Sequence, residues 1–200
     1  MQRERVAVWV GEKVKVSASP KIGEKCRTRK TRRSPKERET WSTWPAPHKT
    51  PHRMGMDITW LTDRIAVGGG IWTAGNMAKV AQAGVTHIID MQIEFDDTPL
   101  AKAYGIDVLW NPTDDDFEGK PAELFQRGVD FARTALGRAN AKLFIHCAAG
   151  IHRGPMMALA LLGSMGWDLD VASQLIEARR PAADLPRVYM DSVEKFLEQV

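Results

Sequence analysis

The sequence is poor in cysteine and has no long apolar run. Only two of its 200 residues are cysteines, Cys26 and Cys147, and they lie far apart in the chain. This scarcity excludes a small domain built on disulfide bonds and favours a reducing, cytoplasmic location. The longest apolar stretch, residues 155–163, is too short to span a bilayer, and no early run has the length of a signal peptide. The sequence therefore predicts a cytoplasmic protein without a membrane span.

Charge is distributed unevenly along the chain. Residues 1–55 contain 15 Lys and Arg against 5 Asp and Glu, a net charge of +10, whereas residues 56–200 carry a net charge of −7. The first segment is also rich in Ser, Thr and Pro and lacks a sustained apolar period, which predicts a disordered basic arm. It has no recognisable nucleic-acid motif, so we interpret the arm as a solvated tail. Its charge leaves binding to nucleic acid or to an acidic partner open.

Residues 56–200 alternate between short β-type runs and helical patterns. Predicted strands lie within residues 58–69, 86–90, 106–110 and 142–147, and predicted helices within residues 73–84, 121–139, 154–166, 170–180 and 187–199. Strands that alternate with helices predict an α/β domain with a mostly parallel central sheet flanked by helices. We therefore expect one catalytic domain over residues 56–200.

The stretch IHCAAGIHRGP, residues 145–155, joins a predicted strand to a predicted helix. In an open α/β sheet a ligand site is expected at the carboxyl end of a strand, where the next helix presents its N-terminus. Backbone N–H groups and the helix dipole at that point favour an anion, and small loop residues let the backbone close around a phosphate. The residues predicted to surround the phosphate are Ala148, Ala149, Gly150, Ile151, His152 and Gly154.

Two residues of this stretch suggest a reaction. A cysteine at a helix N-terminus and beside an arginine is favoured as a thiolate, so Cys147 is a candidate nucleophile. Arg153 is predicted to bind two phosphate oxygens bidentately and to stabilise the transition state. The alternative is a buried core cysteine with an unrelated arginine. The neighbouring His146, Gly150 and the strand-to-helix setting favour a phosphate-ester hydrolase that uses neither a metal nor another cofactor.

The motif resembles the signature of the cysteine-dependent protein phosphatases, HCxxGxxR followed by Ser or Thr. Here it reads His146-Cys147-Ala148-Ala149-Gly150-Ile151-His152-Arg153 and then Gly154. Residues 57–199 also resemble a dual-specificity phosphatase domain, in LTDRIAVGGG with Asn76, in GVTHIID and in EARRPAADLPRVYMDSVEKFLE. The resemblance implies a dual-specificity phosphatase-like fold and a phosphocysteine intermediate on Cys147. The implied partner is a protein or peptide carrying phosphotyrosine, with phosphoserine and phosphothreonine as further possibilities.

The resemblance also implies a general acid, an aspartate on a loop roughly thirty residues before the cysteine, which protonates the leaving oxygen. The segment WNPTDDDFEGK supplies three aspartates at that distance. A Pro-Thr-x-Asp pattern common in related domains selects Asp115, and Asp114 and Asp116 are the alternatives.

Two positions depart from the expected pattern. Gly154 lacks the hydroxyl that helps the cysteine sulfur to leave in the family, which predicts a slow second step. His152 is predicted to be an exposed loop residue, the alternative being that it adds positive charge at mildly acid pH.

Two other functions remain open. The first is a phosphoinositide or RNA phosphatase of the same superfamily, which the lysine-free loop and the acidic body disfavour. The second is a phosphate-binding pseudophosphatase, which the presence of Cys147, Arg153 and the aspartates disfavours.

Overall fold

The structure, a computed structural model, describes residues 55–200. The predicted basic arm, residues 1–55, therefore lies outside the described residues except for Gly55. The strands are β1 (Ile58–Trp60), β2 (Ile65–Gly68), β3 (His87–Asp90), β4 (Asp107–Trp110) and β5 (Leu143–His146). The helices are α1 (Ala74–Gln82), α2 (Thr98–Ala101), α3 (Ala122–Leu136), α4 (Arg153–Ser164), α5 (Leu169–Arg179) and α6 (Arg187–Leu197), with a 3-10 turn at Lys102–Tyr104.

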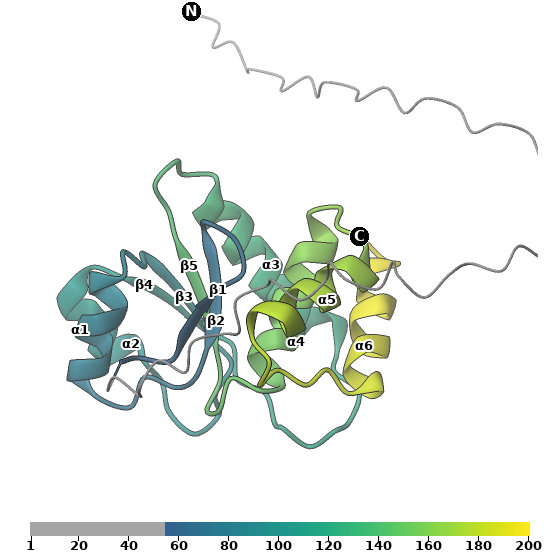
Figure 1. Cartoon of the computed structure of the whole chain (residues 1–200), viewed down its shortest axis with the longest axis horizontal. Helices are drawn as coiled ribbons and strands as arrows, with labels where there is room; N and C mark the ends of the chain where they lie inside the picture. The colour runs from purple at the N-terminus through teal and green to yellow at the C-terminus, as the bar shows by residue number, and fades with distance from the viewer. Residues whose placement is uncertain (1–54) are drawn as a thin grey trace, which may run out of the picture. The chain divides into compact units, whose positions relative to one another are not determined.

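The five strands form one sheet in the order β1-β2-β5-β3-β4 (Figure 1). Strands β2, β5, β3 and β4 run parallel, and β1 pairs antiparallel with β2 at one edge. This confirms the predicted mostly parallel sheet. In register, His146 at the end of β5 lies between Gly68 of β2 and Asp90 of β3. The loops that follow these three strands therefore leave the sheet at the same edge.

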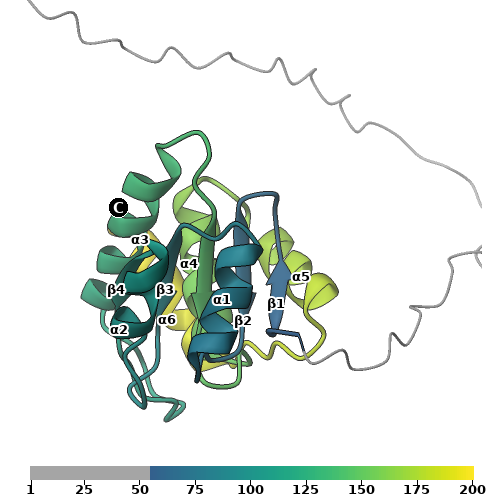
Figure 2. The ribbon, with the colours of Figure 1, turned by 90° about the vertical axis from the view of Figure 1, so that its left-hand side faces the viewer.

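Helices cover both faces of the sheet. Helices α1 and α2 lie on one face and α3 to α6 on the other (Figures 1 and 2). The second face holds the larger core, because α4 packs against β5 and is surrounded by α3, α5 and α6. Every residue of α4 from Arg153 to Leu162 is buried, which explains its nearly continuous apolar sequence.

The sequence patterns did not predict α2 or the 3-10 turn that follows it. Helix α2 has only four residues and is too short to show helical periodicity. The other elements fall within the ranges predicted for them, except that α4 and α5 each begin one residue earlier, at Arg153 and Leu169. Within residues 55–200, no helix combines the length and the apolar character that crossing a membrane would require.

Arg64, in the turn between β1 and β2, ties this turn to the end of α3. Its side chain donates hydrogen bonds to the carbonyl oxygens of Ala141 (3.0 Å), Leu136 (2.8 Å) and Arg138 (2.6 Å). The Leu136 carbonyl belongs to the last turn of α3, where carbonyl groups have no intrahelical partner. Arg64 therefore acts as a C-terminal cap supplied by a distant segment.

We expect Arg64→Leu to lower the free energy of unfolding by about 2 kcal/mol, because hydrogen bonds from a charged donor are lost. Urea denaturation followed by circular dichroism measures this change. Arg133→Leu is the matched control, because Arg133 donates a single exposed hydrogen bond to Ser164. An equal loss in both variants would contradict the capping role.

Candidate functional site

The loop from Cys147 to Arg153 connects β5 to α4 and has the predicted strand-to-helix setting. The Cys147 side chain is buried, and the Gly150 N–H donates a hydrogen bond to its Sγ over 3.2 Å. Gly150 has a φ of 66°, and a β-carbon there would lie 2.4 Å from the Gly68 carbonyl. Only glycine fits this position without displacing the backbone. The tight turn thus directs a backbone N–H at the cysteine sulfur.

Arg180, just after α5, is buried and donates hydrogen bonds to two carbonyl groups of the loop. Its Nε donates to the Gly150 carbonyl over 2.6 Å and its Nη2 to the Ala149 carbonyl over 3.3 Å. The same guanidinium pairs with both carboxylate oxygens of Asp57, at 2.8 and 2.6 Å. These hydrogen bonds hold the pKa of Asp57 below its usual range, although burial opposes the shift. An ion pair thus fixes two carbonyl groups of the loop.

Arg153 is buried at the start of α4 and is held by a carboxylate of the β3–α2 loop. Its two terminal nitrogens donate to the two oxygens of Glu94 over 3.0 and 2.8 Å, and Nη1 also donates to the Thr113 carbonyl over 3.1 Å. These bonds hold the pKa of Glu94 below its usual range. Nε has no hydrogen-bond partner among the described residues. Since guanidinium has five N–H groups, the edge formed by Nε and one Nη2 hydrogen stays available for an anion.

The three consecutive aspartates of the β4–α3 loop have different surroundings. Asp115 Oδ2 lies 3.1 Å from His152 Nδ1 and 3.8 Å from Arg153 Nε. Asp116 instead forms an ion pair with Lys120, whose hydrogen bond lowers the pKa of Asp116. Asp114 makes no hydrogen bond or ion pair with any described residue. Of the three, the structure brings only Asp115 to the phosphate-binding loop.

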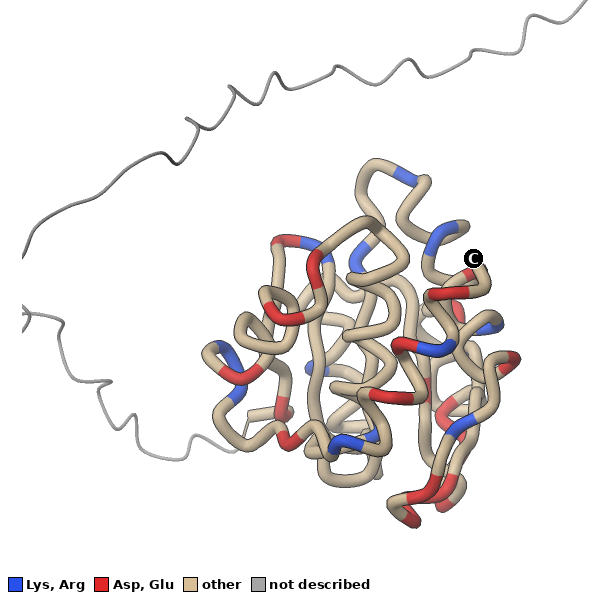
Figure 3. The backbone as a smooth tube through the Cα atoms, turned by 90° about the vertical axis from the view of Figure 1, so that its right-hand side faces the viewer, with Lys and Arg blue, Asp and Glu red and all other residues tan. Residues whose placement is uncertain are grey.

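The surface of this edge of the sheet is acidic. Acidic residues gather on the loops that follow β3 and β4 (Figure 3). Part of the negative net charge of residues 56–200 therefore lies on the loops beside the site.

The prediction that His152 is an exposed loop residue is wrong. Its side chain is only 17% exposed, and its second ring nitrogen, Nε2, lies 3.6 Å from Asp184 Oδ2. The ring also forms an edge-to-face contact with Phe117, with centroids 5.0 Å apart. The fold of the β4–α3 loop covers the histidine, which no local sequence pattern indicated.

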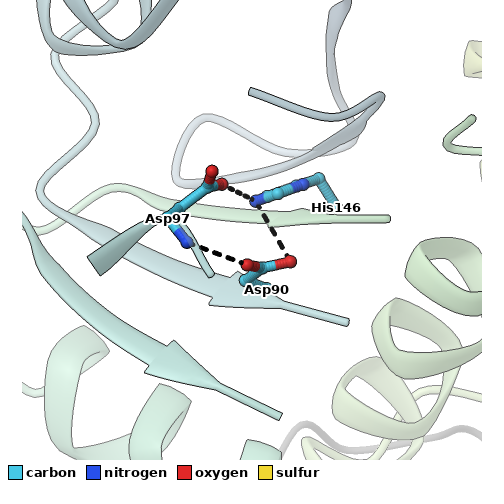
Figure 4. Close-up of side chains that lie close together, drawn as sticks. All are labelled: Asp90, Asp97 and His146. Carbon is cyan, nitrogen blue, oxygen red and sulfur yellow. Dashed lines mark hydrogen bonds and ion pairs between the residues drawn. The ribbon is translucent and has the colours of Figure 1, made fainter. Parts of the chain in front are cut away.

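Behind the loop, His146 lies among buried carboxylates (Figure 4). Its Nε2 is 2.8 Å from Asp97 Oδ2 and 3.8 Å from Asp90 Oδ1, and all three side chains are fully buried. The 2.8 Å contact is a close ion pair without well-aligned hydrogen-bond geometry. Donor atoms of the three residues lie within 4.8 Å of one another, a spacing that could also hold a metal ion. The backbone N–H groups of Gln92 and Asp97 both donate to Asp90, so the cluster also organises the β3–α2 loop that carries Glu94.

Comparison with known proteins identifies this arrangement. Residues 70–198 match the family described as dual specificity phosphatase, catalytic domain. The chain belongs to the dual-specificity phosphatase family. The solved structures show the same fold at low sequence identity. Tk-PTP in its active form is 19% identical with a TM-score of 0.63, and the match covers 72% of this chain and 98% of that one.

Two other solved structures are similar to this dual-specificity phosphatase. PTPMT1 in complex with PI(5)P is 17% identical with a TM-score of 0.64, and the match covers 71% of this chain and 95% of that one. A variant of human DUSP28 is 21% identical with a TM-score of 0.58, and the match covers 72% and 95% respectively. At these identities the likeness shows a shared fold.

Several residues of the site were not predicted from the sequence. Glu94, Arg180 and Asp57 anchor the phosphate-binding loop, and Tyr189 of α6 donates a hydrogen bond to Asp115 Oδ1 over 3.2 Å. None of them belongs to the HCxxGxxR motif. Arg180 stands in EARRP, a segment noted only for its resemblance to the closing helices, and nothing in it distinguished Arg180 from Arg179.

Asp90 makes the stability of the domain depend on pH. Burial raises its pKa from 3.8 to about 6, although the charge of His146 opposes the shift. Because Asp90 binds its proton more tightly in the folded chain, its contribution to stability is complete below pH 3.8 and is lost as the pH rises through about 6. We expect Asp90→Asn to raise the free energy of unfolding at pH 8 by up to about 3 kcal/mol, and to change it little at pH 4.

Chemical denaturation at the two pH values measures this difference. Asp97→Asn is the control, because it weakens the ion pair with His146 and should destabilise the domain. An equal effect of Asp90→Asn at pH 4 and pH 8 would show that the carboxyl does not titrate in this range.

Proposed function

We propose that this phosphatase domain hydrolyses phosphate monoesters through a phosphocysteine on Cys147, without a metal ion. The observation that carries the proposal is the buried Nε of Arg153, which lacks a hydrogen-bond partner among the described residues. A buried donor without a hydrogen bond is costly, by about 1–3 kcal/mol. A phosphate oxygen at the Nε edge would satisfy it. Such a phosphate would also face the loop whose Gly150 N–H points at Cys147.

In the first step the Cys147 thiolate attacks phosphorus. The S–P bond forms while the bond from phosphorus to the ester oxygen breaks, and Asp115 gives its proton to the departing oxygen. Arg153 and the loop N–H groups stabilise the charge on the three equatorial oxygens. The products of this step are the free alcohol or phenol and the phosphocysteine.

In the second step a water molecule attacks the phosphocysteine. Asp115, now a carboxylate, takes a proton from the water, the S–P bond breaks, and phosphate and the Cys147 thiolate are released. A hydroxyl at position 154 would donate a hydrogen bond to the departing sulfur, and Gly154 cannot. The second step therefore limits turnover.

We propose phosphotyrosine on proteins or peptides as the substrate, with phosphoserine and phosphothreonine as further substrates. Two exposed apolar side chains, Ile93 and Phe117, stand on the loops that carry Glu94 and Asp115. They suit an aromatic ester better than a sugar-like or nucleotide one. The acidic loops after β3 and β4 also disfavour phosphoinositides and RNA, which bring further negative charge.

We expect quenched-flow hydrolysis of 4-nitrophenyl phosphate, in chelator and reductant, to show a burst of phenol followed by slow steady turnover. Cys147→Ser should abolish both phases, since the nucleophile is removed, while leaving the fold unchanged by circular dichroism. Wild-type activity that survives in Cys147→Ser would sink the cysteine mechanism. A folded protein that binds vanadate without any burst would favour the phosphate-binding pseudophosphatase.

We expect Gly154→Ser to raise the steady-state rate and to reduce the accumulation of phosphoenzyme. A β-carbon at this position would lie 3.3 Å from His146 Cα, so α4 must move by a few tenths of an ångström. Gly154→Ala requires the same movement but supplies no hydroxyl, which makes it the matched control. A similar gain in both variants would assign the effect to the movement of α4.

A further inference from the structure

His152 occupies an unusual place between three segments of the chain. It lies in the phosphate-binding loop, and each of its ring nitrogens faces a carboxylate: Nδ1 is 3.1 Å from Asp115 Oδ2, and Nε2 is 3.6 Å from Asp184 Oδ2. Asp115 belongs to the β4–α3 loop and Asp184 to the α5–α6 loop. The ring thus bridges two loops that the sequence places far apart.

The backbone around His152 is fixed on both sides. The Asp184 N–H donates to the Ile151 carbonyl over 3.0 Å, which ties the α5–α6 loop to the phosphate-binding loop. The His152 carbonyl accepts from the Met156 N–H over 2.9 Å in the first turn of α4. The ring therefore projects from a rigid base, and the Asp184 carboxylate is placed beside it by main-chain bonds.

Asp115 is held at its other oxygen as well. The Tyr189 hydroxyl donates to Asp115 Oδ1 over 3.2 Å and accepts from the Phe117 N–H over 3.0 Å. The Phe117 ring stacks on Tyr189, with centroids 6.0 Å apart, and forms an edge-to-face contact with His152. Phe117 has a φ of 58°, a conformation that a bulky residue rarely adopts. Such strain persists only where the surroundings enforce it, and here one part of the ring packs against His152 and Tyr189 while the rest stays exposed.

We propose that His152 is a positioning residue that fixes the Asp115 carboxyl over the phosphate-binding loop, with Asp184 bracing the ring from behind. The proposal rests on the function proposed above, in which Asp115 is the general acid. Residues 114–119 are all exposed, so this segment depends on its few anchors to place the acid. A shift of about 1 Å in such a group costs roughly 100-fold in rate.

An imidazole suits this role because a carboxyl oxygen can accept a hydrogen bond in both protonation states of Asp115. When Asp115 carries the proton that it delivers to the ester oxygen, Oδ2 still has a lone pair that can accept from Nδ1–H. When Asp115 is a carboxylate, Nδ1–H can donate to it as well. The contact between Nδ1 and Oδ2 can therefore persist through both steps.

The leaving group of the substrate distinguishes positioning of the acid from binding of the phosphate. A general acid matters most when the departing oxygen is strongly basic, as in phenyl phosphate, and least for 4-nitrophenyl phosphate. We expect His152→Ala to lower kcat/KM for phenyl phosphate about 10-fold to 100-fold, and for 4-nitrophenyl phosphate much less. Asp115→Asn should show the same selective loss, and the double variant should be no worse than Asp115→Asn alone.

Two further variants complete the experiment. His152→Asn places an amide near the position of Nδ1 and should recover part of the activity on phenyl phosphate. Glu118→Gln removes a charge from the same loop, where the Glu118 side chain has no hydrogen bond or ion pair with any described residue, and should behave as wild type. Amide hydrogen exchange at Phe117 and Lys120 should quicken in His152→Ala and stay unchanged in Glu118→Gln, a readout that does not need turnover.

The outcomes are separable. An equal loss of kcat/KM on both esters with a raised KM would show that His152 acts on the phosphate, and unchanged kinetics and amide exchange would show that it has no role; either overturns the proposal. Failure of the proposed function has a different signature, because Cys147→Ser would then retain activity. In that case, faster amide exchange in His152→Ala would still show that the histidine anchors the loop, and unchanged exchange would overturn the anchoring.

Discussion

The phosphate-binding loop depends on the hydrogen bonds that Arg180 donates to its carbonyl groups. A loop can present N–H groups to an anion only if its carbonyls point elsewhere, and Arg180 binds the carbonyls of Ala149 and Gly150. Gly150 can follow this turn because it has no side chain. The hydrogen bond from Gly150 N–H to the sulfur then follows from the same geometry. The carbonyl groups bound by Arg180 and the N–H group directed at the Cys147 sulfur are thus two results of one arrangement of the backbone.

The sequence predicted those features that are encoded locally. Alternating apolar runs and helical periods located the strands and the long helices, and the motif from His146 to Arg153 located the loop between β5 and α4. The anchors of that loop could not be predicted in this way. Arg153 meets Glu94 across 59 residues, and Arg180 meets Asp57 across 123. Such pairs are created by the topology of the sheet and leave no periodic signal, and the same holds for the contacts of His152 with Asp115 and Asp184.

The buried basic side chains around the loop are each paired with a carboxylate, but the pairs differ in exposure. Glu94 and Asp57 are 41% and 55% exposed, whereas His146, Asp90 and Asp97 are fully buried. An ion pair whose carboxylate stays partly in water has a smaller desolvation penalty than one that is buried entirely. The fully buried cluster bears a larger penalty, which appears in the raised pKa of Asp90. We interpret its role as fixing the β3–α2 loop, and through it Glu94, more than as adding stability.

The bond between Asp57 and Arg180 also defines how much chain the catalytic unit needs. The family match begins at residue 70, yet Asp57 and the strands β1 and β2 all precede that residue. Strand β2 lies inside the sheet beside β5, and Gly68 packs against the turn at Gly150. A fragment cut to the matched residues would leave β5 at an open edge and Arg180 without its counterion. The folded unit therefore includes Asp57, β1 and β2, and fusion or truncation boundaries belong upstream of Asp57.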